Sequence, residues 1–201
     1  MKRFIFFCTF FMFVTSLLTA QRFIARAYTG FSLSQMEGDA MAGFDKAGLT
    51  AGVQVQAALT EQIGLGMEVG YIQKGSRQGI WDIMLFSTDA KTTLNYAQIP
   101  VFLELRDWYI SNKEYYKIAG HIGMSYDFLI SQESDNPIID TFVDQYDNDF
   151  SFIAGGTFFF TKRLGLTVRY SRSLTQMYQD DQLTTGGLRN YLWTIRGEFA
   201  F

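Results

Sequence analysis

The residue with the clearest capacity for acid–base chemistry is His121, the single histidine of the chain. Asp127 and several serines lie near it in the sequence, so we first consider a lipid hydrolase or acyltransferase with His121 as its general base. Asp127 is six residues away, however, which is roughly 20 Å along an extended strand and too far for a catalytic pair. The sequence also lacks a G-x-S-x-G motif, which marks the nucleophile of many hydrolases. We therefore predict that the protein is not an enzyme and has neither catalytic residues nor a cofactor.

A second kind of chemistry, metal binding, would need the acidic residues that gather between positions 132 and 149. Asp144, Asp147 and Asp149 offer the carboxylate oxygens that Ca²⁺ prefers, but the stretch lacks the glycine and the final glutamate of an EF-hand loop. We interpret the segment as a solvated acidic loop and predict no metal site, with these three aspartates as weak candidates. One hypothesis is that divalent ions bridge this loop to anionic lipopolysaccharide.

The elements that hold these residues are predicted from a periodicity of two, which places apolar and polar residues on opposite faces of a β-strand. Residues 190–201 show it most clearly. Their apolar face carries Tyr191, Trp193, Ile195, Phe199 and Phe201, and their polar face carries Asn190, Thr194, Arg196 and Glu198. Eight such segments follow residue 21, each close to the roughly 9–11 residues that cross a tilted barrel wall. The segments are 23–34, 47–59, 63–74, 97–106, 116–130, 150–161, 164–174 and 190–201.

The connections between these segments alternate in length. Residues 60–62, 107–113 and 162–163 form short turns, whereas the connections 35–46, 77–92, 132–148 and 177–188 are long and polar. Outer-membrane barrels show this pattern, with turns in the periplasm and loops outside the cell. An even number of strands then places both termini in the periplasm.

The N-terminus has the features of an export signal. Lys2 and Arg3 form a short basic region, residues 4–18 are almost entirely apolar, and Ala20 offers a small residue for cleavage before Gln21. We predict a cleaved signal peptide at 1–20 and one barrel domain at 21–201. Cleavage leaves 15 of the 17 basic residues against 20 acidic ones, a net charge of −5, and an acidic chain without a basic cluster is a poor binder of nucleic acid.

Composition agrees with an all-β membrane protein. The chain has 20 Phe and 18 Gly but 2 Pro, which suits strands punctuated by glycine. A single Cys and a single His exclude disulfide frameworks and Cys/His zinc sites. A soluble lipocalin-like barrel also alternates, but eight strands enclose too little volume for so many Phe, Tyr, Leu and Ile side chains. We therefore predict an eight-stranded antiparallel up-and-down transmembrane β-barrel, with its apolar face toward lipid.

The polar faces of the strands then fill the lumen with ionisable side chains. We expect a lumen network of Arg26, Glu68, Glu104, Lys117, His121, Arg169, Arg196 and Glu198, with Lys74, Arg106 and Asp127 on the same face. A selective pore or proton relay is one interpretation of this set. Because charges away from water must be compensated and eight strands leave no open channel, we favour a mutually paired network that plugs the barrel.

Four stretches resemble the PorT-like outer-membrane β-barrel family of Bacteroidota. They are residues 38–48 (GDAMAGFDKAG), 71–76 (YIQKGS), 96–100 (YAQIP) and 169–175 (RYSRSLT), in the same order along the chain. The resemblance implies a small, porin-like outer-membrane barrel of eight strands. It also implies a possible accessory role, since the name-giving member is similar to a component of the type IX secretion and gliding machinery.

We therefore predict a non-enzymatic outer-membrane barrel whose lumen is filled by paired polar residues and whose acidic extracellular loops contact a surface or partner. The alternatives are an accessory subunit of a secretion or gliding machine and a narrow porin-like channel. Expected partners are outer-membrane lipid and lipopolysaccharide and the barrel-insertion machinery, with other outer-membrane or secretion-complex proteins as further candidates. Phe201 is predicted to be the assembly signal that the insertion machinery reads, and the last strand is predicted to close the barrel on segment 23–34.

Overall fold

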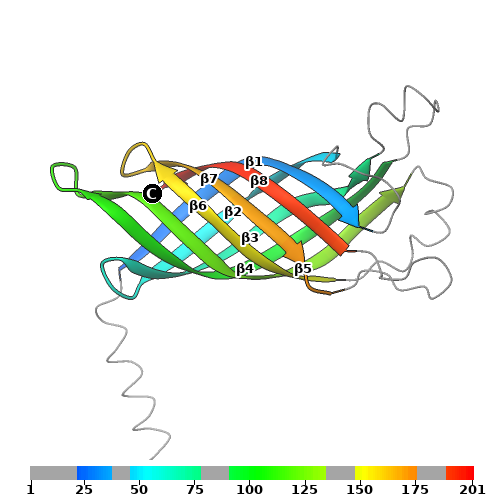
Figure 1. The fold of residues 1–201 in the computed structure, drawn as a ribbon, viewed down its shortest axis with the longest axis horizontal. Helices are drawn as coiled ribbons and strands as arrows, with labels where there is room; N and C mark the ends of the chain where they lie inside the picture. The colour runs from blue at the N-terminus through cyan, green and yellow to red at the C-terminus, as the bar shows by residue number, and fades with distance from the viewer. Residues whose placement is uncertain (1–21, 38–45, 78–90, 135–147, 176–188) are drawn as a thin grey trace, which may run out of the picture.

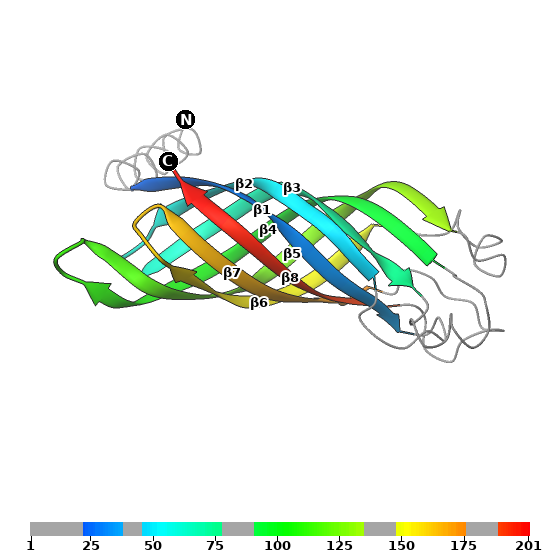
Figure 2. The same ribbon diagram turned by 90° about the horizontal axis from the view of Figure 1, so that it is seen from above.

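The computed structural model describes residues 22–37, 46–77, 91–134, 148–175 and 189–201. These residues form eight strands, which are β1 (Phe23–Glu37), β2 (Lys46–Ala58), β3 (Ile63–Arg77), β4 (Lys91–Ile110), β5 (Tyr115–Ser134), β6 (Asp149–Phe159), β7 (Leu164–Ser173) and β8 (Arg189–Ala200). Neighbouring strands pair antiparallel all the way round, so the sheet is a closed barrel, as Figures 1 and 2 show. The predicted fold class is confirmed. Within the described ranges, no helix is long and apolar enough to cross a membrane.

The barrel closes where the sequence predicted, by pairing of the last strand with the first. The register runs from Arg26 opposite Ala200 to Glu37 opposite Arg189. Beyond this ladder, the N–H of Phe201 donates to the carbonyl of Ala25 at 3.1 Å. Because β8 bonds to both β7 and β1, the sheet has no unpaired edge along this seam.

Several strands are longer than the apolar alternation predicted. β4 begins at Lys91 rather than at residue 97, and residues 107–110, assigned to a turn from the sequence, continue the strand. Hydrogen bonds of the Asn95 side chain show why the strand begins early. Asn95 accepts from Tyr71 at 2.7 Å and from Gln73 at 3.1 Å, and it donates to Ser131 at 2.9 Å. Cross-strand bonds between polar side chains extend the sheet where apolar alternation has ended.

The two faces of the wall differ as expected. In β8 the outward residues Trp193, Ile195 and Phe199 are 41–46% exposed, whereas the inward Arg196 is 2% exposed. An apolar exterior around a polar interior inverts the arrangement of a soluble barrel and matches a wall that faces lipid.

The interior also holds large apolar and aromatic side chains, most of which are not expected there from the alternation. They are Tyr28, Ile72, Leu94, Tyr96, Phe102, Ile153, Phe159 and Leu192. Glycines on nearby strands make room for them. A Cβ at Gly66 would lie 2.4 Å from the Phe102 ring, and one at Gly70 would lie 2.2 Å from the Tyr28 hydroxyl.

The two ends of the barrel have different connections. The turns 59–62, 111–114 and 160–163, the start of β1 and the end of β8 all lie at one end, called here the turn end (Figure 1). The four long connections leave from the opposite end, called here the far end. Residues 38–45, 78–90, 135–147 and 176–188 of these connections, and the predicted signal peptide, lie outside the described residues.

Candidate functional site

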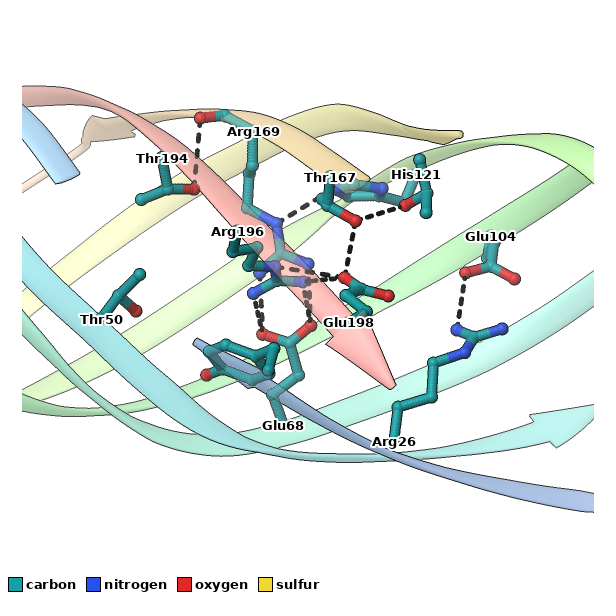
Figure 3. Close-up of polar contacts among 12 residues, drawn as sticks. Arg26, Thr50, Glu68, Glu104, His121, Thr167, Arg169, Thr194, Arg196 and Glu198 are labelled. Carbon is teal, nitrogen blue, oxygen red and sulfur yellow. Dashed lines mark hydrogen bonds and ion pairs between the residues drawn. The ribbon is translucent and has the colours of Figure 1, made fainter. Parts of the chain in front are cut away.

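An ion-pair network, in which two arginines share one carboxylate, crosses the middle of the lumen. Glu68 of β3 accepts two hydrogen bonds from Arg169 of β7, at 2.9 and 2.8 Å, and two from Arg196 of β8, at 2.8 and 2.7 Å (Figure 3). β3 and β7 lie opposite each other in a ring of eight strands, so the Glu68–Arg169 pair spans the full diameter. Such bidentate, charge-assisted pairs are the strong and geometrically specific ones.

Further contacts surround the two guanidinium groups. Arg196 lies 4.2 Å from the centre of the Tyr28 ring, and Arg169 lies 5.1 Å from that of Phe102. Glu198 accepts a hydrogen bond from Arg196 Nε at 3.2 Å and another from the Thr167 hydroxyl at 2.6 Å. The Tyr28 and Phe102 rings thus form cation–π contacts with the two guanidinium groups. We call Glu68, Arg169, Arg196 and Glu198 the central layer.

His121 belongs to the edge of the central layer and not to a catalytic pair. Its Nε2 accepts a hydrogen bond from Arg169 Nε at 2.9 Å, and its ring is 5.5 Å from that of Phe102. The lone pair that a general base would use is therefore occupied. Asp127 serves elsewhere in the lumen.

A second layer lies toward the far end and is built around Lys74. Its ammonium group is 2.6 Å from Asp127 and 2.5 Å from Asp149. Asp127 also accepts a hydrogen bond from Ser125, and Asp149 accepts from Ser151, Ser173 and Thr175. We call Lys74, Asp127 and Asp149 the far layer.

Asp149, a weak metal candidate in the sequence analysis, has a different role in the structure. It is fully buried, and its carboxylate neutralises Lys74 from inside the barrel. Asp144 and Asp147 lie outside the described residues, and the described part of the chain contains no cluster of three or more potential metal ligands. The parity of Asp149, which it shares with Ser151 in β6, is the signal in the sequence that places it inside.

A third layer lies toward the turn end. Glu104 is 3.3 Å from Arg26 and 2.9 Å from Arg106. Arg26 also rests on the Phe159 ring, 5.1 Å from its centre. Arg26 Nε and Arg106 Nη2 are buried without a hydrogen-bond partner among the described residues. This turn layer, Arg26, Glu104 and Arg106, has one net positive charge, which is opposite to the one net negative charge of the far layer.

Lys117 is not part of these layers, although the sequence analysis placed it in the lumen network. Its ammonium lies 4.5 Å from the centre of the Trp108 ring and 5.4 Å from that of Phe158, both of which are exposed aromatics. Lys117 follows the turn that joins β4 and β5, where the strands pass beyond the closed wall. Its inward parity therefore no longer directs it into the lumen.

The three layers together are electrically balanced. Their cations are Arg26, Lys74, Arg106, Arg169 and Arg196, and their anions are Glu68, Glu104, Asp127, Asp149 and Glu198. A cavity of about 10 Å³ lies between the central and far layers, bordered by Thr50, Gln98 and Leu192 among others. It has room for about one water molecule. The arrangement is suited to filling and bracing a barrel.

The sequence of residues 18–179 matches a family described as the outer membrane protein beta-barrel domain. No curated protein matches the chain. The finer resemblance to PorT-like barrels stays a prediction.

Among solved structures, the chain is similar to Ail, the attachment invasion locus protein of Yersinia pestis, whose structure was solved in complex with the heparin analogue sucrose octasulfate. The sequence identity is 10% and the TM-score is 0.49, and the match covers 90% of this chain and 99% of that one. It is similar to the outer membrane protein OprG of Pseudomonas aeruginosa, with 9% identity, a TM-score of 0.47, and coverage of 90% and 97%. It is also similar to Neisserial surface protein A, with 11% identity, a TM-score of 0.45, and coverage of 89% and 97%.

Proposed function

Because this chain belongs to the outer membrane protein beta-barrel domain family, we propose that it is a plugged outer-membrane barrel that works through its ends. In this proposal the lumen is a structural core that neither conducts nor catalyses. The observation that carries it is the Glu68–Arg169 pair, which spans the full diameter of the barrel and is braced by Arg196. An eight-stranded barrel is just wide enough for its side chains to fill it.

The energetics of the central layer support a plug rather than a gated pore. Glu68 is fully buried, and removing either partner from such a group leaves an uncompensated charge at a cost of about 3–5 kcal/mol. Opening a path through the middle of the lumen would break four hydrogen bonds to Glu68 at once. A narrow porin-like channel is therefore disfavoured.

Conductance in planar lipid bilayers tests this proposal. We expect purified protein to give no stable, uniform current steps. The variant in which Glu68, Arg169 and Arg196 are all replaced by alanine keeps the lumen charge balanced within one unit and removes the crossing pair, so it should conduct if the pair is the plug. Uniform steps from the wild-type protein would contradict the proposal.

The absence of enzymatic activity is part of the same proposal. The bond from Arg169 to His121 occupies the histidine nitrogen, and Ser125 donates its hydroxyl hydrogen bond to Asp127. Neither side chain is free for acyl chemistry. Assays of phospholipase and palmitoyl-transfer activity should be negative, and any activity that disappears in His121→Ala would refute this part.

A second candidate function is an accessory subunit of an outer-membrane secretion or gliding machine. The observation that favours it is the length of β4 and β5, 20 residues each against 10 to 12 in β6, β7 and β8. Strands that continue beyond the apolar band offer backbone and polar side chains to a partner. A deletion strain with a secretion or gliding defect would support this function, whereas a defect confined to surface attachment would support the first proposal.

The orientation we propose places the turn end and both termini in the periplasm and the long connections outside the cell. In this orientation the acidic segment 132–148 faces lipopolysaccharide, and its contact with divalent ions is testable by calorimetry. N-terminal analysis of protein from the outer membrane should begin at Gln21. Surface proteolysis of whole cells should cut in the long connections and spare the turn 111–114.

A further inference from the structure

A cluster of aromatic side chains, most of them exposed, surrounds one lysine at the turn end. The hairpin of β4 and β5, the adjacent end of β6 and the turn after it contribute Trp108, Tyr109, Tyr116, Phe158 and Phe160, of which Tyr116 is half-buried. Together with Lys117 we call them the hairpin cluster. The ammonium of Lys117 lies 4.5 Å from the centre of the Trp108 ring and 5.4 Å from that of Phe158. Further ring pairs, Tyr109–Tyr116 at 5.0 Å and Phe158–Phe160 at 5.2 Å, hold the cluster together.

The backbone of this hairpin is strained where the cluster is built. Trp108 has a φ of 59° and Glu114 a φ of 53°, and they are the non-glycine residues with positive φ in the described part of the chain. A bulky residue rarely adopts this conformation because its side chain crowds the backbone. At Trp108 the strain is offset in part by a hydrogen bond from its N–H to the Asp107 carboxylate at 2.7 Å. This backbone conformation places the Trp108 indole against Lys117 and leaves Trp108 55% exposed.

Lys117 has aromatic neighbours and, within the described part of the chain, no anionic partner. It forms no ion pair with any residue in the described ranges, unlike the lumen cations Arg26, Lys74 and Arg169. An ammonium group carries three hydrogen-bond donors, and contacts with ring faces do not use them up. The Lys117 ammonium group is therefore held in position, and its N–H donors are available to an anionic ligand.

The cluster is continuous with the outer wall of the barrel. Phe158 is paired with Ile118 on one side and with Leu166 on the other, and both are outward and exposed. A phospholipid whose acyl chains lie on this part of the wall would bring its phosphate to the level of Lys117. The continuity with the lipid-facing wall thus favours a lipid phosphate over an anion free in solution.

We propose that the hairpin cluster is a binding site for the phosphate of an anionic phospholipid in the leaflet at the turn end. Lys117 binds the phosphate, Trp108 and Phe158 hold the ammonium in place, and Tyr109 and Tyr116 lie at the headgroup level, where such amphipathic rings accumulate. The inference rests on insertion of the barrel in a membrane and is independent of whether the lumen is plugged. The hairpin cluster is thus one defined binding position for a phospholipid on the barrel surface.

The depth of Trp108 is the first test. The chain has three tryptophans, so a variant with Trp81→Phe and Trp193→Phe keeps Trp108 as its single indole. In vesicles with lipids brominated near the headgroup, Trp108 fluorescence should be quenched more strongly than with lipids brominated near the chain ends. Absence of quenching by either lipid would place the hairpin in water and overturn the proposal, whichever way the conductance experiment turns out.

Selectivity for the lipid charge is the second test. In vesicles of phosphatidylcholine with a minor share of spin-labelled phosphatidylglycerol, Lys117→Gln should lower the relative affinity for the labelled lipid about fivefold, since one basic residue near an anionic surface contributes about 1 kcal/mol. Lys117→Arg should retain the selectivity. Lys162→Gln is the matched control, because Lys162 is exposed in the turn 160–163 at the same end and no aromatic ring of the described residues lies over its ammonium group.

The outcomes of the second test are distinct. Equal losses in Lys117→Gln and Lys162→Gln would show diffuse electrostatic attraction and overturn a specific site. A loss in Lys117→Gln alone supports it. Heat-dependent mobility of each variant in gel electrophoresis verifies that the barrel is folded, so a failure to fold is not mistaken for a loss of binding.

Discussion

At the scale of single residues, Glu68 is the centre of the lumen. One carboxylate accepts four hydrogen bonds from two guanidinium groups, and Tyr28 and Phe102 lie against those groups. Each arginine has a further contact, Arg196 with Glu198 and Arg169 with His121. Because all these side chains are buried, their charges depend on one another rather than on water.

Replacing Glu68 by glutamine should therefore be strongly destabilising. The change keeps the size of the side chain but leaves Arg169 and Arg196 without their shared anion, which should lower the free energy of unfolding by about 3–5 kcal/mol. Urea titration of the refolded barrel in lipid measures it. Glu61→Gln, an exposed change in the turn 59–62, is the control and should have little effect.

The network makes a further prediction about the double variant. In Glu68→Gln, Arg196 keeps Glu198 as its anion, whereas Arg169 keeps no anion among the described residues. Adding Arg169→Met therefore removes the unpaired cation, so the double variant should be more stable than Glu68→Gln alone. If the two substitutions lowered the free energy of unfolding by strictly additive amounts, the two residues would not act together in one central layer.

At the scale of elements, β3 combines two opposite roles on its inward face. Glu68 and Lys74 supply charges, whereas Gly64, Gly66 and Gly70 supply space for side chains from other strands. The Phe102 ring of β4 occupies the space above Gly66, and the Tyr28 hydroxyl of β1 approaches Gly70. The absence of side chains at these positions is thus what allows aromatic rings inside so narrow a barrel.

Gly66→Ala should accordingly destabilise the barrel. A Cβ there would lie 2.4–2.9 Å from three atoms of the Phe102 ring, and forced overpacking of this kind costs about 1–3 kcal/mol. The same urea titration measures it, with Gly120→Ala as the control, because a Cβ at Gly120 has nothing within 4 Å. Recovery of stability in Gly66→Ala with Phe102→Leu would identify the ring as the cause, and an unchanged loss would contradict it.

At the scale of the whole molecule, the seam between β1 and β8 turns a sheet into a barrel. It joins residues near both ends of the chain, from Arg26 opposite Ala200 to Glu37 opposite Arg189, and continues in the bond from Phe201 to Ala25. Such long-range pairing forms late and leaves strand edges exposed until it is complete.

Deleting Phe201 should impair assembly more than the stability of the finished barrel. The change removes one seam hydrogen bond and an aromatic side chain that is 76% exposed, so little packing energy is lost. We expect a lower yield of folded protein in the outer membrane and near-normal unfolding of what is folded. Wild-type levels of folded protein would show that Phe201 is not an assembly signal, and Leu59→Ala, which removes another exposed apolar side chain at the turn end, serves as the control.

The sequence by itself determined the wall of this protein. Alternation of apolar and polar residues is a local property, so it located all eight strands and most of their inward and outward residues. Closing eight strands into a barrel then requires the last strand to pair with the first. It also identified most of the lumen charges, because Glu68, Arg169 and Arg196 lie on polar faces of clear alternation.

The tertiary structure alone decided which of these residues meet. Parity places a side chain inside a barrel but says nothing about its height or its partner across the lumen, which depend on strand tilt and register. Asp149, one of three weak metal candidates because of its acidic neighbours in the sequence, pairs instead with Lys74 inside the barrel. Lys117, predicted in the lumen network from its parity, lies instead against Trp108. The crossing of Glu68 to Arg169, 101 residues away in the chain, exists only once the sheet has closed on itself.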